Sequence, residues 1–199
     1  MSEHEVTEVP RIAIFGGTFD PVHNGHLELV QKAFREIKLD QIILVPCRRS
    51  PHKEDNPGAE DHQRFRMLEI AFEDHPSARV SDYELKKPPP SFTWETVGHF
   101  KSRFPPNARF FLLIGLDQWD GLPRWKNIET LSKDVEFIVV GRSGHPEPRS
   151  GYRAHFIQGN HPASASRIRQ DLAAGKPPRW LPESVADYIL KKGLYSPAP

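Results

Sequence analysis

The sequence predicts an α/β fold in which helices cover both faces of a Rossmann-like, doubly wound and mostly parallel sheet. Short apolar segments alternate along the chain with segments whose apolar residues recur at helical spacing, which is the pattern of βαβ units. The chain of 199 residues is long enough for one domain with its own core. Its 20 prolines, roughly double the average share, concentrate in the connections between these segments.

Six apolar segments are predicted strands, at residues 11–15, 41–45, 79–85, 110–114, 136–140 and 154–157. Five segments are predicted helices, at residues 26–37, 65–72, 93–104, 166–174 and 182–192, and Gly193 is expected to stop the last one. We expect a single domain over residues 11–195, between a disordered N-terminal tail, 1–10, and a short C-terminal tail, 196–199.

The composition of the chain argues against several classes of function. The net charge of +1 does not indicate a nucleic-acid partner, and no apolar run approaches the length of about 20 residues that a membrane span needs. The single cysteine, Cys47, excludes an intramolecular disulfide and is interpreted as an ordinary free thiol rather than a nucleophile. We therefore expect a cytoplasmic protein without a membrane or nucleic-acid partner; a homo-oligomer is neither indicated nor excluded.

Parallel sheets bind ligands beyond the carboxyl ends of their strands, and the connection after the first predicted strand is chemically unusual. It reads G-G-T-F-D-P-V-H-N-G-H, from Gly16 to His26. Gly16 and Gly17 let the backbone approach an anion closely, and His23 and His26, three residues apart, can face one point at the start of a helix. A phosphate there would favour both imidazoles as cations. The alternative is a structural loop whose histidines cap the helix.

These residues resemble the T/H-x-G-H signature of the nucleotidylyltransferase superfamily, and the longer string is similar to bacterial nicotinate-mononucleotide adenylyltransferases. The similarity extends from Arg11 to Tyr195 through further matches: P-H-K at 51–53, P-S-F-T at 90–93, I-G-L-D at 114–117, P-R-W at 123–125, V-V-G-R at 139–142 and S-A-S-R-I-R at 164–169. In the last motif Ala163 and Ser166 replace the usual isoleucine and threonine, which are mild departures.

The resemblance implies a nucleotidylyltransferase fold and an enzyme that joins ATP and nicotinate mononucleotide into nicotinate adenine dinucleotide and pyrophosphate, with Mg²⁺ carried by the phosphates. It implies catalytic roles for His23, His26 and Arg169. The implied ATP-binding residues are Gly16, Gly17, Thr18, Phe19, His52, Lys53, Gly115, Asp117, Ser164 and Ser166. The implied mononucleotide-binding residues are Asp20, Thr93 and Trp125.

Several of these residues have a second interpretation. Asp117 either accepts hydrogen bonds from ribose hydroxyls or caps a helix, and Trp125 either stacks on the nicotinate ring or packs on the core. Ser166 is a predicted N-cap, and Arg169, which opposes the helix dipole there, either binds phosphates or is solvated. Arg48 and Arg49 add positive charge that is either functional or ordinary surface charge.

Three rival functions remain open at this point. Another acceptor is conceivable, namely nicotinamide mononucleotide, phosphopantetheine or the substrate of a CTP-dependent enzyme. A module that binds nucleotide without chemistry is disfavoured because His23, His26, Ser164 and Arg169 are all present. A dehydrogenase is disfavoured because the first connection is not G-x-G-x-x-G.

Overall fold

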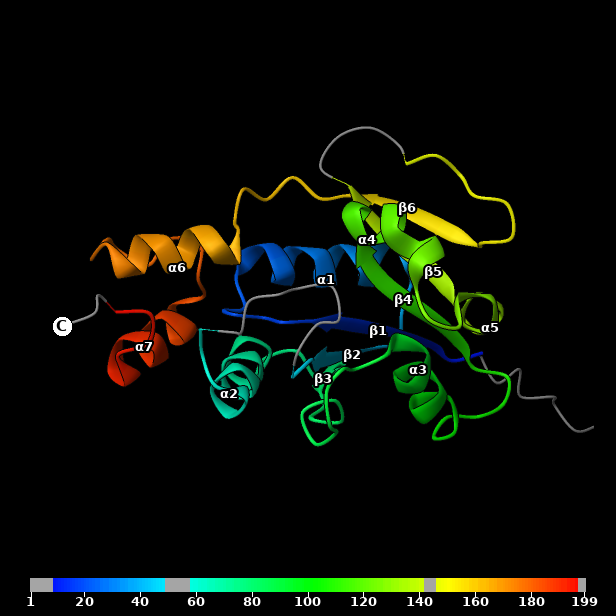
Figure 1. The fold of residues 1–199 in the computed structure, drawn as a ribbon, viewed down its shortest axis with the longest axis horizontal. Helices are drawn as coiled ribbons and strands as arrows, with labels where there is room; N and C mark the ends of the chain where they lie inside the picture. Colours follow the sequence, from blue (N-terminus) through cyan, green and yellow to red (C-terminus); the bar gives the residue numbers. More distant parts are fainter. Residues whose placement is uncertain (1–8, 49–57, 142–145, 197–199) are drawn as a thin grey trace, which may run out of the picture.

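A computed structural model describes residues 9–48, 58–141 and 146–196, and its centre is a sheet of six parallel strands (Figure 1). The strand order is β3-β2-β1-β4-β5-β6. The strands are β1 (Arg11–Gly17), β2 (Gln41–Pro46), β3 (Ala78–Val80), β4 (Arg109–Gly115), β5 (Glu136–Gly141) and β6 (Ala154–Gln158). Every neighbouring pair is parallel, which confirms the predicted doubly wound α/β class.

Helices cover both faces of the sheet. One face packs against α1 (Asn24–Ile37), α2 (Asp61–Ala71), α6 (Ala165–Ala173) and α7 (Glu183–Lys192), and α6 and α7 lie together at one end of the molecule (Figure 1). The other face packs against α3 (Thr93–Lys101), α4 (Leu116–Gly121), the 3₁₀ turn η1 (Leu122–Arg124) and α5 (Ile128–Asp134). The molecule is therefore a three-layer sandwich with two hydrophobic cores.

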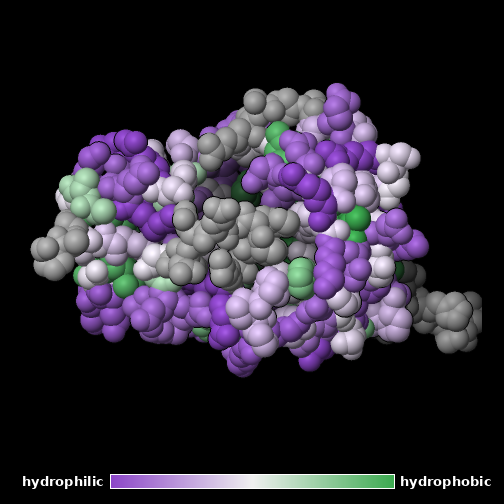
Figure 2. All heavy atoms as spheres, in the orientation of Figure 1, coloured by the Kyte–Doolittle hydropathy of each residue, from purple (hydrophilic) through white to green (hydrophobic). Residues whose placement is uncertain are grey.

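Alternation along the strands supplies both cores. Successive strand side chains point to opposite faces, so Ala13 and Phe15 enter one core while Ile12 and Ile14 enter the other. Because both faces are covered, β1, β2, β4 and β5 are apolar after their first residue rather than alternating with polar residues. The face drawn in Figure 2 is mostly hydrophilic, and its hydrophobic residues form small, separate spots outside the grey atoms.

Most predicted elements are confirmed, and the differences have local causes. The third strand ends at Val80 rather than Leu85, because the chain turns at Asp82 and carries the next residues away from the sheet. The third helix ends at Lys101, three residues early. The elements α4, η1 and α5 have seven residues or fewer, too few for a helical period to show in the sequence. Residues 1–8 and 197–199 of the predicted tails lie outside the described residues.

The strand order places a crevice at the carboxyl end of the sheet. The chain runs outward from β1 through β2 to β3, and then returns to add β4, β5 and β6 on the other side of β1. Phe15 near the end of β1 is level with Leu113 of β4, so the connections that leave these two strands diverge from adjacent points. This switch point is where doubly wound sheets bind ligands.

Candidate active site

Two hollows open at the switch point and share Leu113 and Ile114 as their common wall. The α3 pocket, of about 350 Å³, lies on the face covered by α3 and η1; its walls include Gly16, Gly17, Thr18, Glu84, Thr93 and Trp125. The α1 pocket, of about 620 Å³, lies on the face covered by α1 and α6; its walls include His23, His26, Asp117, Gly159, His161 and Ser164. The predicted site residues are thus divided between two adjoining pockets.

The two predicted histidines stand together at the beginning of α1. His23 is the buried N-cap residue, and its ring stacks on that of His26 with centroids 3.8 Å apart. Gly25 makes this packing possible, because a Cβ atom on it would lie only 3.1 Å from the His23 ring. Both rings line the α1 pocket, as their spacing of three residues predicts.

A hydrogen bond defines the protonation of His26. Its Nδ1 accepts from the backbone N–H of His23 at 3.1 Å, so the ring hydrogen of the neutral form is on Nε2. While this bond is formed, the ring of His26 carries a single proton and is a neutral N–H donor, in keeping with its place at the positive end of a helix. The expectation that a bound phosphate favours both imidazoles as cations concerns the complex with the anion and stays a prediction.

Phe19 holds this ring and does not line either pocket. It is buried, and its ring meets that of His26 edge-on with centroids 5.0 Å apart. Its φ of 49° is unusual for a residue with a side chain, and such strain persists where surrounding contacts fix it. Phe19 therefore packs against the His26 ring, and its predicted contact with ATP stays a prediction.

The glycines and threonine of the first connection lie on the other side of β1 from the histidines. Gly16, Gly17 and Thr18 line the α3 pocket, together with Cys47, whose Sγ lies 3.9 Å from the Thr18 hydroxyl oxygen. A Cβ on Gly17 would approach the Phe19 ring to 3.1 Å. These three residues are therefore placed toward Thr93 and Trp125 rather than among the other predicted ATP-binding residues.

Asp20, a predicted mononucleotide-binding residue, lines neither pocket in this structure. Its carboxylate is buried and accepts hydrogen bonds from the backbone N–H groups of Gly58 and Ala59 and from the Tyr195 hydroxyl. A carboxylate engaged in this way binds distant segments of its own chain together.

The two predicted serines lie at the beginning of α6, and Arg169 lies in the middle of this helix. Ser164 is the N-cap residue and lines the α1 pocket, whereas Ser166, the predicted cap, is exposed in the first turn. Arg169 donates from Nη1 to the carbonyl oxygen of Asp20 at 2.6 Å, and its side chain remains 34% exposed. The arginine is therefore neither buried nor freely solvated, but held along one edge.

Asp117 lies in the first turn of α4 and lines the α1 pocket with an exposed side chain. Gly115 is the N-cap residue of α4, so Asp117 is not the cap. A Cβ atom on Gly115 would lie 2.7 Å from the Asp117 Oδ1 atom, so the glycine leaves room for the carboxylate in this position. The pocket wall thus carries an acceptor of the kind that the ribose prediction requires.

Trp125 and Thr93 face the α3 pocket together. Thr93 is the first residue of α3, and Trp125 is half-buried directly after η1. Of the other tryptophans, Trp119 is buried in the core, and Trp94 and Trp180 pack against the two cores. The half-buried Trp125 combines the two interpretations, since it packs on the core and also lines a pocket.

Sequence reasoning missed a buried carboxyl group in the α3 pocket. Glu84 is 7% exposed and accepts a hydrogen bond from the Thr96 hydroxyl at 2.6 Å. Burial raises the pKa of Glu84, against the opposing effect of Thr96 and of Ser91, whose hydroxyl lies beside the carboxyl without hydrogen-bond geometry. No local signal marks this residue, because the sequence pattern includes it in a strand.

Arg64 was also missed. It is fully buried on α2 and donates to the carbonyl oxygen of Thr18 at 2.6 Å and to Asp61 at 2.7 Å. Of the predicted basic residues, His52, Lys53 and Arg49 lie outside the described residues. Arg48 forms an exposed ion pair with Asp61 at 3.0 Å, in agreement with ordinary surface charge.

Two further properties bear on the kind of site. Within residues 9–48, 58–141 and 146–196, no three acidic, imidazole or thiol side chains converge as ligands for a metal ion. None of the described helices is both long and apolar enough to span a membrane.

Comparison with known proteins places this geometry in a family. Residues 14–171 match the cytidylyltransferase-like family model. The Bacillus subtilis nicotinate-nucleotide adenylyltransferase is 35% identical over 188 residues, which cover 93% of this chain and 98% of the relative. A Methylacidiphilum infernorum protein named probable nicotinate-nucleotide adenylyltransferase is 37% identical over 193 residues, covering 94% and 93%.

A solved structure shares the fold. The Plasmodium falciparum nicotinic acid mononucleotide adenylyltransferase complexed with NaAD superimposes with a TM-score of 0.75 at 22% identity, covering 94% of this chain and 97% of that chain. At this identity the likeness supports the architecture alone.

Proposed function

The chain belongs to the nicotinate-nucleotide adenylyltransferases of the cytidylyltransferase-like family, and from this membership we propose that it transfers the adenylyl group of ATP to nicotinate mononucleotide. The products are nicotinate adenine dinucleotide and pyrophosphate, in the biosynthesis of NAD. The observation that carries the proposal is the pair of pockets that meet at Leu113 and Ile114, since the reaction must bring two nucleotides together at one phosphorus atom. Both substrates are metabolites of the cytoplasm, where we place the enzyme.

The chemistry of the walls supports one nucleotide for each pocket. The α1 pocket, with the helix beginnings at His23 and Ser164 and the carboxylate of Asp117, suits the phosphates and ribose of ATP. The α3 pocket offers Trp125 as an aromatic surface for the nicotinate ring. Free backbone N–H groups at the start of α3 suit the ring carboxylate, and this would favour the acid over the amide.

The reaction requires no protein nucleophile. A phosphate oxygen of the mononucleotide forms a bond to the α-phosphorus of ATP as the bond from that phosphorus to the bridging oxygen breaks, and pyrophosphate leaves. Orientation of two bound nucleotides contributes about 7–11 kcal/mol in favourable cases. The Nε2–H group of His26 is the donor that we assign to the developing charge, with His23 beside it and Arg169 directed to the departing phosphates.

The residues present suit a Mg²⁺ ion that arrives with ATP. Because the described side chains offer no converging set of ligands, phosphate oxygens and water would hold the ion rather than a protein cage. Bound in this way, Mg²⁺ supplies charge neutralisation for the triphosphate. His23, His26 and Arg169 then supply donors from the protein side.

A direct assay tests the proposal. Purified protein is mixed with ATP, Mg²⁺ and nicotinate mononucleotide, and both pyrophosphate and the dinucleotide are measured. We expect the two products in equal amounts, and a much lower kcat/KM when nicotinamide mononucleotide replaces the acid. A folded sample that releases no pyrophosphate would falsify the enzymatic assignment, whereas equal rates with both acceptors would overturn only the selectivity.

A further inference from the structure

Three distant parts of the chain meet at the carboxylate of Asp20. Its Oδ2 accepts from the backbone N–H of Gly58 at 2.7 Å, and its Oδ1 accepts from Ala59 at 3.0 Å and from the Tyr195 hydroxyl at 2.6 Å. Asp20 is 3% exposed, so these bonds are protected from competition with water. The loop after β1, the approach to α2 and the segment after α7 are thereby fastened at one point.

Arg169 belongs to the same cluster. Its Nη1 donates to the Asp20 carbonyl at 2.6 Å and lies 3.5 Å from the Asp20 carboxylate. Gly58 is enclosed between the Tyr195 ring and the Arg169 stem, because a Cβ on it would lie 3.2 Å from the first and 3.3 Å from the second. Within the described part of the chain no hydrogen bond engages Nε or Nη2 of Arg169, which leaves these donors for an anion.

Tyr195 is held in a demanding conformation. Its φ of 57° lies in the left-handed region, which is unfavourable for a residue with a side chain and persists where surrounding contacts impose it. Burial, followed by the adjacent Asp20 carboxylate, raises the pKa of Tyr195, so the hydroxyl keeps its proton and donates throughout the neutral range. The Tyr195 hydroxyl is therefore a constant hydrogen-bond donor to the Asp20 carboxylate.

We propose that Tyr195 is a positioning residue for Arg169 in the adenylyl transfer. The Tyr195 hydroxyl fixes Asp20, Asp20 holds one edge of the Arg169 guanidinium, and the remaining donors are thereby presented to the triphosphate. This inference rests on the proposed function, because it takes the anion to be ATP. It gives the segment that follows α7, which lines neither pocket, a part in building the site.

The test removes the hydroxyl alone, with Tyr195→Phe, and compares it with Tyr188→Phe, a half-buried tyrosine of α7 that packs on the same core. We expect Tyr195→Phe to reduce kcat/KM for ATP by between about tenfold and a hundredfold, the cost of a misplaced binding group, while KM for the mononucleotide is unchanged. Tyr188→Phe should leave both substrates unaffected. Wild-type kinetics in Tyr195→Phe would overturn the inference.

A double-mutant cycle separates positioning from general destabilisation. If Tyr195 acts through Arg169, adding Tyr195→Phe to Arg169→Ala causes no further loss in kcat/KM for ATP, whereas independent losses that multiply would overturn the inference. Calorimetric titration of the same variants with ATP makes the result independent of turnover. If the wild type forms no dinucleotide, the proposed function fails. In that case, weaker ATP binding by Tyr195→Phe than by the wild type still supports the positioning role. Equal ATP binding by the two proteins, or no ATP binding by the wild type, refutes it.

Discussion

The two ends of the sheet use the same residue type in opposite ways. At the carboxyl end, Glu84 lines the α3 pocket at 7% exposure, with the Thr96 hydroxyl as its hydrogen-bond partner and a pKa raised by burial. At the amino end, Glu136 at the start of β5 is 6% exposed, and it accepts hydrogen bonds from Arg109 at 2.7 Å and His155 at 2.8 Å. Burial alone would raise the pKa of Glu136, but these partners outweigh it and lower the pKa.

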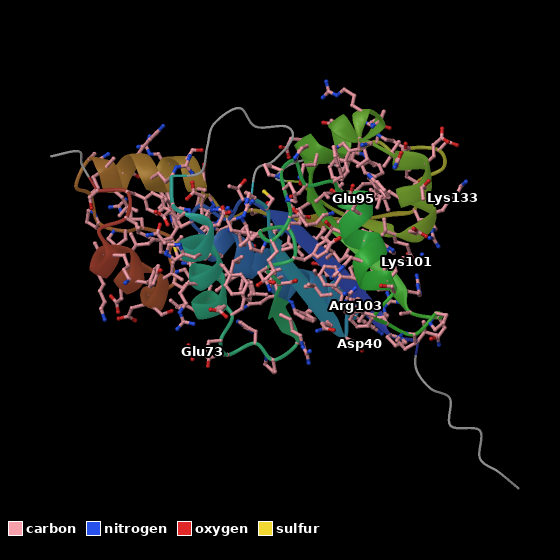
Figure 3. All side chains as sticks on the ribbon, turned by 60° about the horizontal axis from the view of Figure 1, so that its bottom comes forward. Asp40, Glu73, Glu95, Lys101, Arg103 and Lys133 are labelled. Atoms are coloured by element: carbon pink, nitrogen blue, oxygen red, sulfur yellow. The ribbon has the colours of Figure 1, made fainter. Side chains whose placement is uncertain are left out.

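The charged and polar groups around these two glutamates also differ between the two ends of the sheet. Around the amino end, Lys101 forms an ion pair with Asp134, and Figure 3 shows Lys101 and Arg103 on the same side as Asp40, with Glu95 toward the other end of α3. The amino end therefore compensates its charges within the protein. At the carboxyl end, the buried Glu84 carboxyl has no cationic hydrogen-bond partner among the described residues, and the His23 and His26 rings stack beside the other pocket, which is typical of a ligand-binding site.

Replacement of His26 is expected to have the largest effect at the carboxyl end. His26→Ala removes the Nε2–H donor and should reduce kcat by about 10²–10³, the usual cost of losing one donor to developing charge. His26→Gln, whose amide reaches the place of Nε2, should retain more turnover than His26→Asn. Single-turnover rates with saturating substrates provide the measurement. Near-normal turnover in His26→Ala would remove this residue from catalysis and weaken the contrast between the two ends.

The histidine pair was predictable from sequence because its geometry is local. Two residues three apart at a helix start face the same way whatever the rest of the fold does. Glu84 was not predictable, since its pocket exists only after α3, β4 and η1 have assembled around it. The bond between Asp20 and Tyr195 spans 175 residues, beyond the reach of any local pattern. The apolar periodicity predicted the strands and the longer helices. The elements α4, η1 and α5 are too short to show a helical period in the sequence.

The second test exchanges one glutamate at each end. Glu84→Ala removes the closer of two acceptors of the buried Thr96 hydroxyl and leaves it only the Phe92 carbonyl oxygen at 3.5 Å, which costs about 1 kcal/mol of stability. It also disturbs the wall of the α3 pocket. We expect KM for nicotinate mononucleotide to rise about tenfold through the misplaced wall, with KM for ATP unchanged.

Glu136→Ala is the matched control for this test. It should also lower the free energy of unfolding, because Arg109 and His155 lose their buried partner, although both side chains are more than a third exposed and water screens the loss. Neither KM should change. An increase in KM for the mononucleotide in Glu136→Ala as large as that in Glu84→Ala would show that the effect of Glu84 is mere destabilisation.

The smallest expected effect is a difference in the sign of pH dependence. The folded-state pKa of Glu84 is raised, so its contribution to stability is present at pH values below its unfolded pKa and is lost as the pH rises through the folded value. The folded-state pKa of Glu136 is lowered, so its contribution is present above its unfolded pKa and is lost as the pH falls through the folded value.

Urea unfolding of wild type, Glu84→Gln and Glu136→Gln at pH 7, 5 and 4 measures both contributions, because these pH values bracket the ordinary glutamate pKa of about 4.3. Relative to each variant, acidification should favour the wild type over Glu84→Gln and disfavour it against Glu136→Gln. Shifts of the same sign would mean that the two buried carboxyls experience equivalent surroundings, and the contrast between the two ends of the sheet would then not extend to their electrostatics.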